Sequence, residues 1–186
     1  MTGLRERKKA ETRRSIQQHA LRLFLDKGYD ATTVEEIAAA AGVSHMTYFR
    51  YFPSKQAVVE NDEYDPLMAE AIRGRPPGED GLTAIRHALV GAMRPMPAAE
   101  RQTVLVRARL IMGVPALRAR QVESQQVTRE LFAEAVADRE PSEFRRRGVA
   151  AAALGALAVA LEVWVEGDGA EDLVDLVDRA FATLVP

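Results

Sequence analysis

The segment from Ser44 to Tyr51, called here the recognition segment, carries side chains suited to chemistry with a partner molecule. It reads Ser-His-Met-Thr-Tyr-Phe-Arg-Tyr. Hydroxyl and imidazole groups exchange hydrogen bonds with base edges, and a methionine contacts the methyl group of thymine. Because a single aromatic residue in such a segment more often packs than recognises, we expect packing for Phe49 and Phe52. The composition favours a surface that reads nucleic acid.

The chain offers no catalytic or metal-binding constellation. The sequence lacks HExxH, GxSxG, GxGxxG and GxxxxGK motifs, and its three histidines lie too far apart in sequence to form a paired metal site. It also has no cysteine, which excludes disulfides, thiolate metal sites and thiol redox switches. We therefore expect no enzyme, no metal and no cofactor.

A short helix must precede the recognition segment and support it. Thr33 with Glu36 fits a capping box at the start of this helix, and Thr32 with Glu35 fits one equally well. One narrow apolar face then follows at helical spacing, formed by Val34, Ile37, Ala38 and Ala41.

A tight turn connects this helix to the recognition segment. Gly42 permits the turn, Val43 fills the junction, and Ser44 is placed to cap the next helix, which Pro53 ends. Two short helices joined in this way predict a helix-turn-helix, whose second helix enters the major groove of DNA.

These residues resemble the signature of the tetracycline-repressor (TetR) family. The resemblance covers about residues 10–60, while the rest of the chain resembles the family only in its length and helical plan. It implies a repressor that binds double-stranded operator DNA as a homodimer and senses a ligand. The positions that carry it are Ala31-Thr32-Thr33-Val34, Ile37-Ala38, Ala41-Gly42-Val43-Ser44 and Thr47-Tyr48-Phe49-Arg50-Tyr51-Phe52-Pro53-Ser54-Lys55.

The resemblance implies a role for each matching residue. Thr33 would bind a phosphate through its hydroxyl and backbone amide, and Tyr51 and Lys55 would contact further phosphates. Basic residues between positions 5 and 14 would reach flanking phosphates or a minor groove. The positions that face the major groove would be Ser44, His45, Met46, Thr47 and Tyr48.

Two features of the recognition segment depart from the family pattern. The family often has a tyrosine where this chain has Phe49, and a phenylalanine has no hydroxyl for a phosphate, so we expect Phe49 in the core. His45 and Met46 are less usual groove residues, and we expect these two to set the sequence preference.

The remaining pattern predicts an all-α fold of about nine helices, because no run of alternating β-branched residues occurs. We expect a DNA-binding domain at 1–54 and a ligand-binding and dimerisation domain at 55–186, with a Pro- and Gly-rich loop at 73–81. Helices are expected at about 9–27, 33–41, 44–51, 55–72 with a kink or restart at Pro66, 80–93, 98–112, 115–139, 142–166 and 170–184.

Residues 149–165 are apolar on all sides, so a helix there must be covered on every face. The segment is shorter than the roughly 20 residues of a membrane span and contains Glu162, so we expect no membrane. A partner subunit covers one face in our interpretation, in a bundle with the last helix. The expected interface residues are Ala152, Gly155, Ala156, Ala160, Leu173, Val177 and Phe181.

The central helices contain deformable apolar side chains that could line a pocket for a small apolar or amphipathic ligand. Binding of this ligand would shift the protein toward a second conformation. In that conformation the helix at 55–72, bent at Pro66, would hold the DNA-binding domains of the two subunits at a spacing that does not fit the operator. The expected pocket residues are Leu67, Met68, Ile72, Leu89, Met93, Met112 and Phe132, with His87 and Gln126 as polar partners.

The charge is divided unevenly along the chain. Residues 1–56 carry a net charge of +4, whereas the whole chain carries −2, as in a protein that touches a polyanion with one end. No signal sequence is evident, so we expect a cytoplasmic protein. The alternative function is a small-molecule-binding or interaction module with little specific DNA binding.

Overall fold

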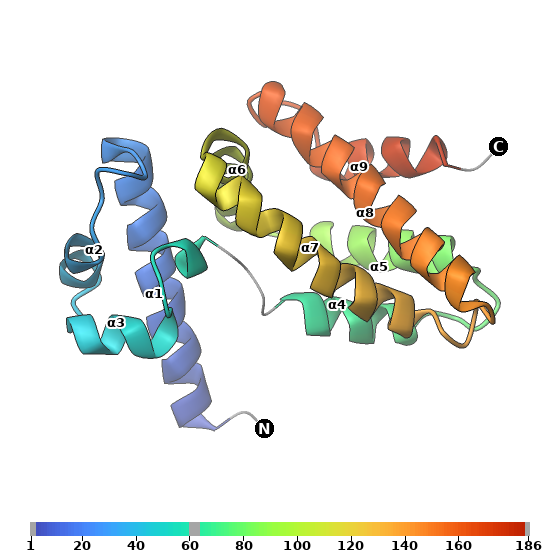
Figure 1. Ribbon diagram of the computed structural model, residues 1–186, viewed down its shortest axis with the longest axis horizontal. Helices are drawn as coiled ribbons and strands as arrows, with labels where there is room; N and C mark the ends of the chain where they lie inside the picture. Colours follow the sequence, from blue (N-terminus) through green and yellow to red (C-terminus); the bar gives the residue numbers. More distant parts are fainter. Residues whose placement is uncertain (1–2, 60–63, 185–186) are drawn as a thin grey trace.

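The computed structural model describes residues 3–59 and 64–184 and contains no strand within them (Figure 1). The head, at one end of the molecule, holds α1 (Leu4–Lys27), α2 (Val34–Ala40) and α3 (His45–Tyr51). The all-α prediction is confirmed. The other elements are a 3-10 helix η1 (Gln56–Val58), α4 (Tyr64–Arg73), α5 (Gly81–Met93), α6 (Ala98–Gly113), α7 (Pro115–Ala135), α8 (Glu143–Glu166) and α9 (Leu173–Ala182).

Local signals set the path of the chain through the head. Gly28 ends α1 with a φ of +88°, and its amide donates to the Phe24 carbonyl at 3.0 Å. The Tyr29 ring then lies 5.0 Å from the Phe24 ring. The capping box of α2 uses Thr33 and Glu36, which settles the choice between the two predicted registers.

The helices from α4 to α9 form the rest of the molecule, called here the body. The core of the head includes side chains from the body. Val106 and Leu110 of α6 are buried in the same cluster as residues of α1, α2 and α3. Arg107 of α6 donates from Nε to the Val59 carbonyl at 2.7 Å. The head therefore packs directly on α6, and the predicted division between residues 54 and 55 stays a prediction. The head residues in this cluster include Ile16, Phe24, Tyr29, Ile37, Tyr48 and Phe52.

The body has a second core, in which α8 is central. Its inward face contacts α5, α6, α7 and α9, and Trp164 Nε1 donates to the Glu171 carbonyl at 3.0 Å, which fixes the turn into α9. By length and composition α8 alone among the described helices could cross a membrane. Its inward face is formed by Ala150, Ala153, Ala156, Ala160 and Trp164.

The predicted fourth helix, at 55–72, differs from the structure. Residues 56–58 form the short η1, with Ser54 Oγ accepting from the Ala57 amide at 3.2 Å, and α4 starts separately at Tyr64. Pro66 lies in the first turn of α4, where a missing amide costs nothing. Within the described residues the predicted helix is thus two separate elements, as the alternative of a restart near Pro66 required, and the bend at Pro66 stays a prediction.

The shared core predicts that a substitution in α6 destabilises the head. We expect Leu110→Ala to lower the free energy of unfolding by about 2–4 kcal/mol and to speed amide exchange in α1–α3. The matched control is Leu89→Ala, in the body core, where the side chain is 3% exposed against 9% for Leu110. If Leu110→Ala left the exchange rates of α1–α3 unchanged, the core would not be shared energetically.

Candidate DNA-binding surface, dimer face and ligand site

The first turn of α3 presents three exposed side chains, those of Ser44, His45 and Met46. Met46 is 82% exposed, so its side chain is accessible to a partner molecule. Ser44 Oγ caps the helix by accepting from the Thr47 amide at 3.1 Å. An exposed imidazole and thioether on one rigid turn form a surface suited to base edges.

His45 is held by two neighbours. Its Nε2 lies 3.2 Å from Oε1 of Glu35, across the junction between α2 and α3. Its ring packs edge-on against Phe49, with 4.7 Å between the ring centroids. The Glu35 carboxylate accepts a hydrogen bond from the Glu35 backbone amide, and this bond, aided by the contact with His45, holds the pKa of Glu35 below its usual value.

The structure exchanges the places expected for Tyr48 and Phe49. Tyr48 is fully buried and donates from its hydroxyl to the Ser54 carbonyl at 3.2 Å, whereas Phe49 is 41% exposed. Tyr48 therefore cannot face the groove, and burial raises its pKa above the usual range. The spacing of Tyr48 and Phe52, at i and i+4, places both on one face of α3 and was the signal for this.

The predicted phosphate contacts have structural partners of their own. Lys55 Nζ donates to the carbonyls of Tyr29 and Thr32 at 2.8 and 2.9 Å and lies over the Tyr29 ring. The Thr33 amide donates to the Glu36 carboxylate at 2.9 Å, so of the two predicted phosphate donors only the hydroxyl remains. Tyr51 is half-buried against the head core. Lys55 therefore joins the end of the recognition segment to the α1–α2 loop.

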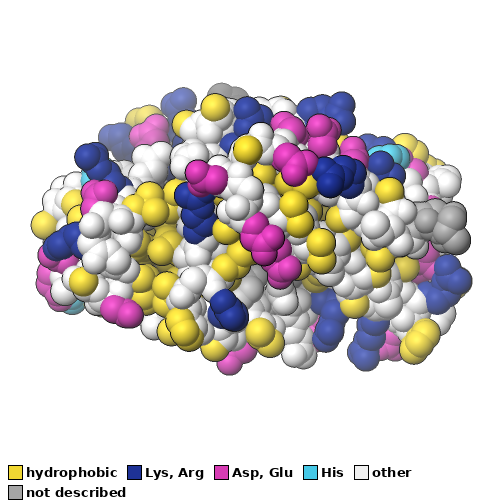
Figure 2. All heavy atoms as spheres, turned by 90° about the horizontal axis from the view of Figure 1, so that it is seen from above, with side chains coloured by type: hydrophobic (Ala, Val, Ile, Leu, Met, Phe, Trp, Pro, Cys, Tyr) yellow, Lys and Arg dark blue, Asp and Glu magenta, His cyan; other side chains and the backbone are white. Residues whose placement is uncertain are grey.

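The first three turns of α1 carry a cluster of exposed cations. Figure 1 shows this end of α1 extending past α3. On the face drawn in Figure 2, acidic and basic side chains are interspersed, so this face as a whole does not attract DNA. A local cluster of cations, such as the one on α1, is needed for that attraction. Arg13 is used differently, because its Nη1 donates to the Tyr51 carbonyl at 2.9 Å. The exposed cations are Arg5, Arg7, Lys8, Lys9 and Arg14.

Most of the predicted dimer residues lie on the inward side of their helices. Five of them are buried in the core of their own chain and are not available to a partner: Ala156, Ala160, Leu173, Val177 and Phe181. Ala152 is half-buried, and a Cβ on Gly155 would meet no atom within 4 Å. The outward face of α8 instead exposes apolar side chains, Val159 at 53% and Val163 at 37%, with Glu162 on the same side.

The predicted ligand residues fall into two groups. Ile72, Leu89 and Phe132 are buried in the body core, with Met68 and Met93 packed against them. Leu67, His87 and Gln126 are exposed and do not face that core, and half-buried Met112 lies outside the body cluster. The structure thus brings five of the nine residues together.

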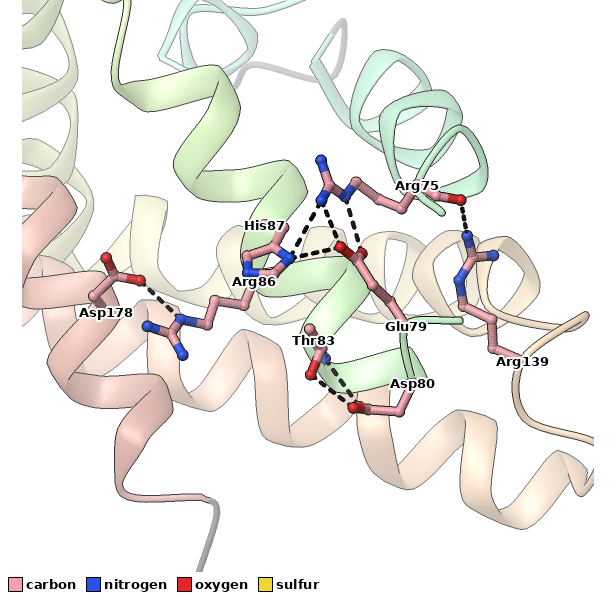
Figure 3. Close-up of polar contacts among 8 residues, drawn as sticks. All are labelled: Arg75, Glu79, Asp80, Thr83, Arg86, His87, Arg139 and Asp178. Atoms are coloured by element: carbon pink, nitrogen blue, oxygen red, sulfur yellow. Dashed lines mark hydrogen bonds and ion pairs between the residues drawn. The ribbon is translucent and has the colours of Figure 1, made fainter. Parts of the chain in front are cut away.

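His87 belongs to a polar network between α5 and the preceding loop (Figure 3). Its Nδ1 lies 2.8 Å from Oε1 of Glu79, which also binds Arg75. The hydrogen bond from Arg75, aided by His87, lowers the pKa of Glu79 to about 2. Arg139, in the turn that follows α7, donates to the Arg75 carbonyl. This network fixes the loop, which explains why His87 does not point into the body core.

The contacts of Lys55 predict that its loss destabilises the protein. We expect Lys55→Ala to lower the free energy of unfolding by about 1.5–3 kcal/mol, as for hydrogen bonds from a charged group, in a urea titration without DNA. Arg50→Ala, an exposed cation on α3, is the matched control and should cost far less. Unchanged stability in Lys55→Ala would return this residue to the role of a simple phosphate contact.

Sequence comparison finds a matching family for each half of the chain. Residues 16–61 match the family described as bacterial regulatory proteins, tetR family, and residues 79–186, more than half of the chain, match the MftR C-terminal domain. The regulator TcmR of Streptomyces glaucescens is 41% identical over 97 residues, which cover 50% of this chain and 43% of that protein. The putative mycofactocin biosynthesis transcriptional regulator MftR of Mycobacterium tuberculosis is 29% identical over 181 residues, covering 94% and 90%.

Solved structures show the same fold. FadR of Thermus thermophilus, in complex with lauroyl-CoA, gives a TM-score of 0.57 at 22% identity and covers 93% of each chain. FadR of Bacillus subtilis, in complex with stearoyl-CoA, gives 0.62 at 18% identity and covers 92% of this chain and 96% of that one. As predicted, the matching family is one of regulators rather than enzymes. The chain belongs to the TetR family and is a DNA-binding transcriptional regulator with a C-terminal domain of the MftR type.

Proposed function

We propose that this regulator is a cytoplasmic repressor that binds an inverted-repeat operator as a homodimer and releases it when a ligand binds the body. The first turn of α3 carries this proposal, because Ser44, His45 and Met46 are all exposed there and lie on one short segment of a helix that is anchored to the head core. The exposed cations of α1 supply attraction to the phosphate backbone. A dimer on its operator blocks polymerase without further parts, which makes repression the simplest outcome.

The uncovered face of α8 supports the homodimer. Gly155, Val159 and Val163 lie on this outward face, and a Cβ at Gly155 would meet no atom within 4 Å, which leaves room there for a second helix. Burying such a face against its own copy removes apolar area from water on both subunits. Two heads related by a two-fold axis then read two half-sites about one helical turn, roughly 34–36 Å, apart.

A groove between α4 and α7 supports a ligand site in the body. Its volume is about 380 Å³, and Leu131 connects it to the body core because this residue packs against the buried cluster. We infer an amphipathic ligand, of the same chemical character as acyl-CoA. Its apolar part would enter between the helices toward Phe132 and Met68. The groove is lined by Asp65, Pro66, Arg120, Glu123, Ser124, Val127 and Leu131.

The direct test of this function is selection of duplexes from a random pool by the purified protein, followed by sequencing. We expect an enriched inverted repeat whose affinity falls steeply with salt, because phosphate contacts release counterions. Met46→Ala should change the preferred bases while keeping most of the affinity. If the folded protein enriched no sequence, the alternative of a binding or interaction module would stand instead.

The dimer face is tested by Val159→Asp. A buried carboxylate opposes association, so we expect a monomer by light scattering and a loss of operator affinity of roughly a hundredfold, since the two half-sites are no longer linked. Val122→Asp on α7, where the side chain is 67% exposed, is the control and should stay dimeric. A dimeric Val159→Asp would contradict the proposed interface.

The ligand site is tested with lauroyl-CoA as the probe and free coenzyme A as the control. We expect lauroyl-CoA to weaken operator binding and coenzyme A to have no effect, because only the former has an apolar chain to place in the body. Val127→Asp, at an exposed residue that lines the groove, should weaken the response and leave operator affinity intact. Equal effects of the two compounds would contradict an acyl-binding body.

A further inference from the structure

We infer that Glu35 positions His45 for base recognition, so that the imidazole presents Nδ1 to the major groove as a hydrogen-bond acceptor. The inference rests on the proposed function, because it assigns sequence preference within the same DNA-binding surface. It adds a residue of α2, outside the recognition segment, to the residues that decide which operator is bound.

The geometry determines which nitrogen carries the proton. Glu35 Oε1 lies 3.2 Å from Nε2 of His45, and an ionised carboxylate only accepts hydrogen bonds. Nε2 must therefore be the donor, and in the neutral ring the other nitrogen, Nδ1, is then the acceptor. Phe49, whose ring centroid is 4.7 Å away at an interplanar angle of 65°, restricts rotation of the imidazole.

Glu35 is the acidic residue of α2 that has this role, because its neighbour is used elsewhere. Glu36 accepts from the Thr33 amide and pairs with Lys27 of α1, and these contacts lower its pKa. The pKa of Glu35 is also below its usual value, first through its own amide and then through His45, so the carboxylate is ionised at neutral pH. Within the described chain, Glu35 is the charged side chain in contact with His45.

An exposed carboxylate on a DNA-binding surface costs affinity, since it is repelled by phosphates of every sequence. Glu35 therefore does not contribute to non-specific DNA binding. Its contact with His45 provides a physical reason for its position, because an imidazole held in one tautomer discriminates between bases and a freely rotating one does not.

An acceptor at Nδ1 selects bases that offer an amino group in the major groove. These are adenine, through N6, and cytosine, through N4, whereas guanine and thymine present acceptors there. At the operator position read by His45, one hydrogen bond should favour amino-bearing bases by about three- to tenfold.

The test compares four proteins in the duplex selection: wild type, His45→Ala, Glu35→Ala and Glu35→Gln. His45→Ala identifies the operator position that His45 reads. Glutamine keeps a carbonyl acceptor for Nε2 and removes the charge, whereas alanine removes both. We expect wild type and Glu35→Gln to favour adenine or cytosine at that position by about three- to tenfold, and Glu35→Ala to lose the preference.

Both Glu35 variants should bind all duplexes somewhat more tightly, because both remove a negative charge. The charge effect is thereby separated from the hydrogen bond. The inference is overturned if Glu35→Ala keeps the wild-type preference, or if the wild type favours guanine or thymine at the position. If the wild type enriches an operator and only the Glu35 variants behave otherwise than expected, the proposed function stands and this inference fails. If the wild type enriches nothing, both fail.

A measurement without DNA tests the same point. Nitrogen-15 spectra of the free protein at pH 8 should show His45 protonated at Nε2. His19 is the internal reference for the opposite tautomer, because its Nδ1 lies 2.8 Å from the Ser15 carbonyl and must donate to it. A His45 ring protonated at Nδ1 would overturn the inference whatever the DNA result.

Discussion

The burial of α6 side chains in the core of the head is the interaction on which the rest of the structure depends. Two of the three helices of the head, α2 and α3, have only seven residues each, too few to be stable alone in water. Val106 and Leu110 complete their core, and Arg107 fastens η1 to α6 through the Val59 carbonyl. A movement of α6 relative to α8 must therefore carry the head with it, which gives a body ligand a physical route to the DNA-binding surface.

Anchoring of one face of α3 explains how its other face is presented. Buried Tyr48 and Phe52 anchor one face of the helix, and Lys55 ties its end to the α1–α2 loop. The opposite face then has fixed positions for Ser44, His45 and Met46, and rigid presentation is what base recognition requires. In the body, α8 packs inward through alanines and leaves Val159 and Val163 exposed on the opposite side, which is the side that the proposed homodimer would bury.

Local features of the fold were predictable because their causes lie within a few residues. Gly28, the capping box at Thr33 and the Ser44 cap each depend on nearby backbone, and all three are observed. The facing of Tyr48 and Phe49 was not predicted, since one residue of error rotates a side chain by about 100° around a helix. The bonds of Lys55 depend on tertiary contacts, and the all-round apolar sequence of α8 gives no sign of which face is inward.

Amide hydrogen exchange with and without an enriched operator tests the central claim, that the head and specifically the recognition segment bind DNA. The account predicts slower exchange over residues 33–51 and in the first turns of α1 when the operator is added, with little change in α7. Slower exchange confined to α4–α7, with residues 33–51 exchanging as before, would contradict the account. The nucleic-acid contact would then lie in the body.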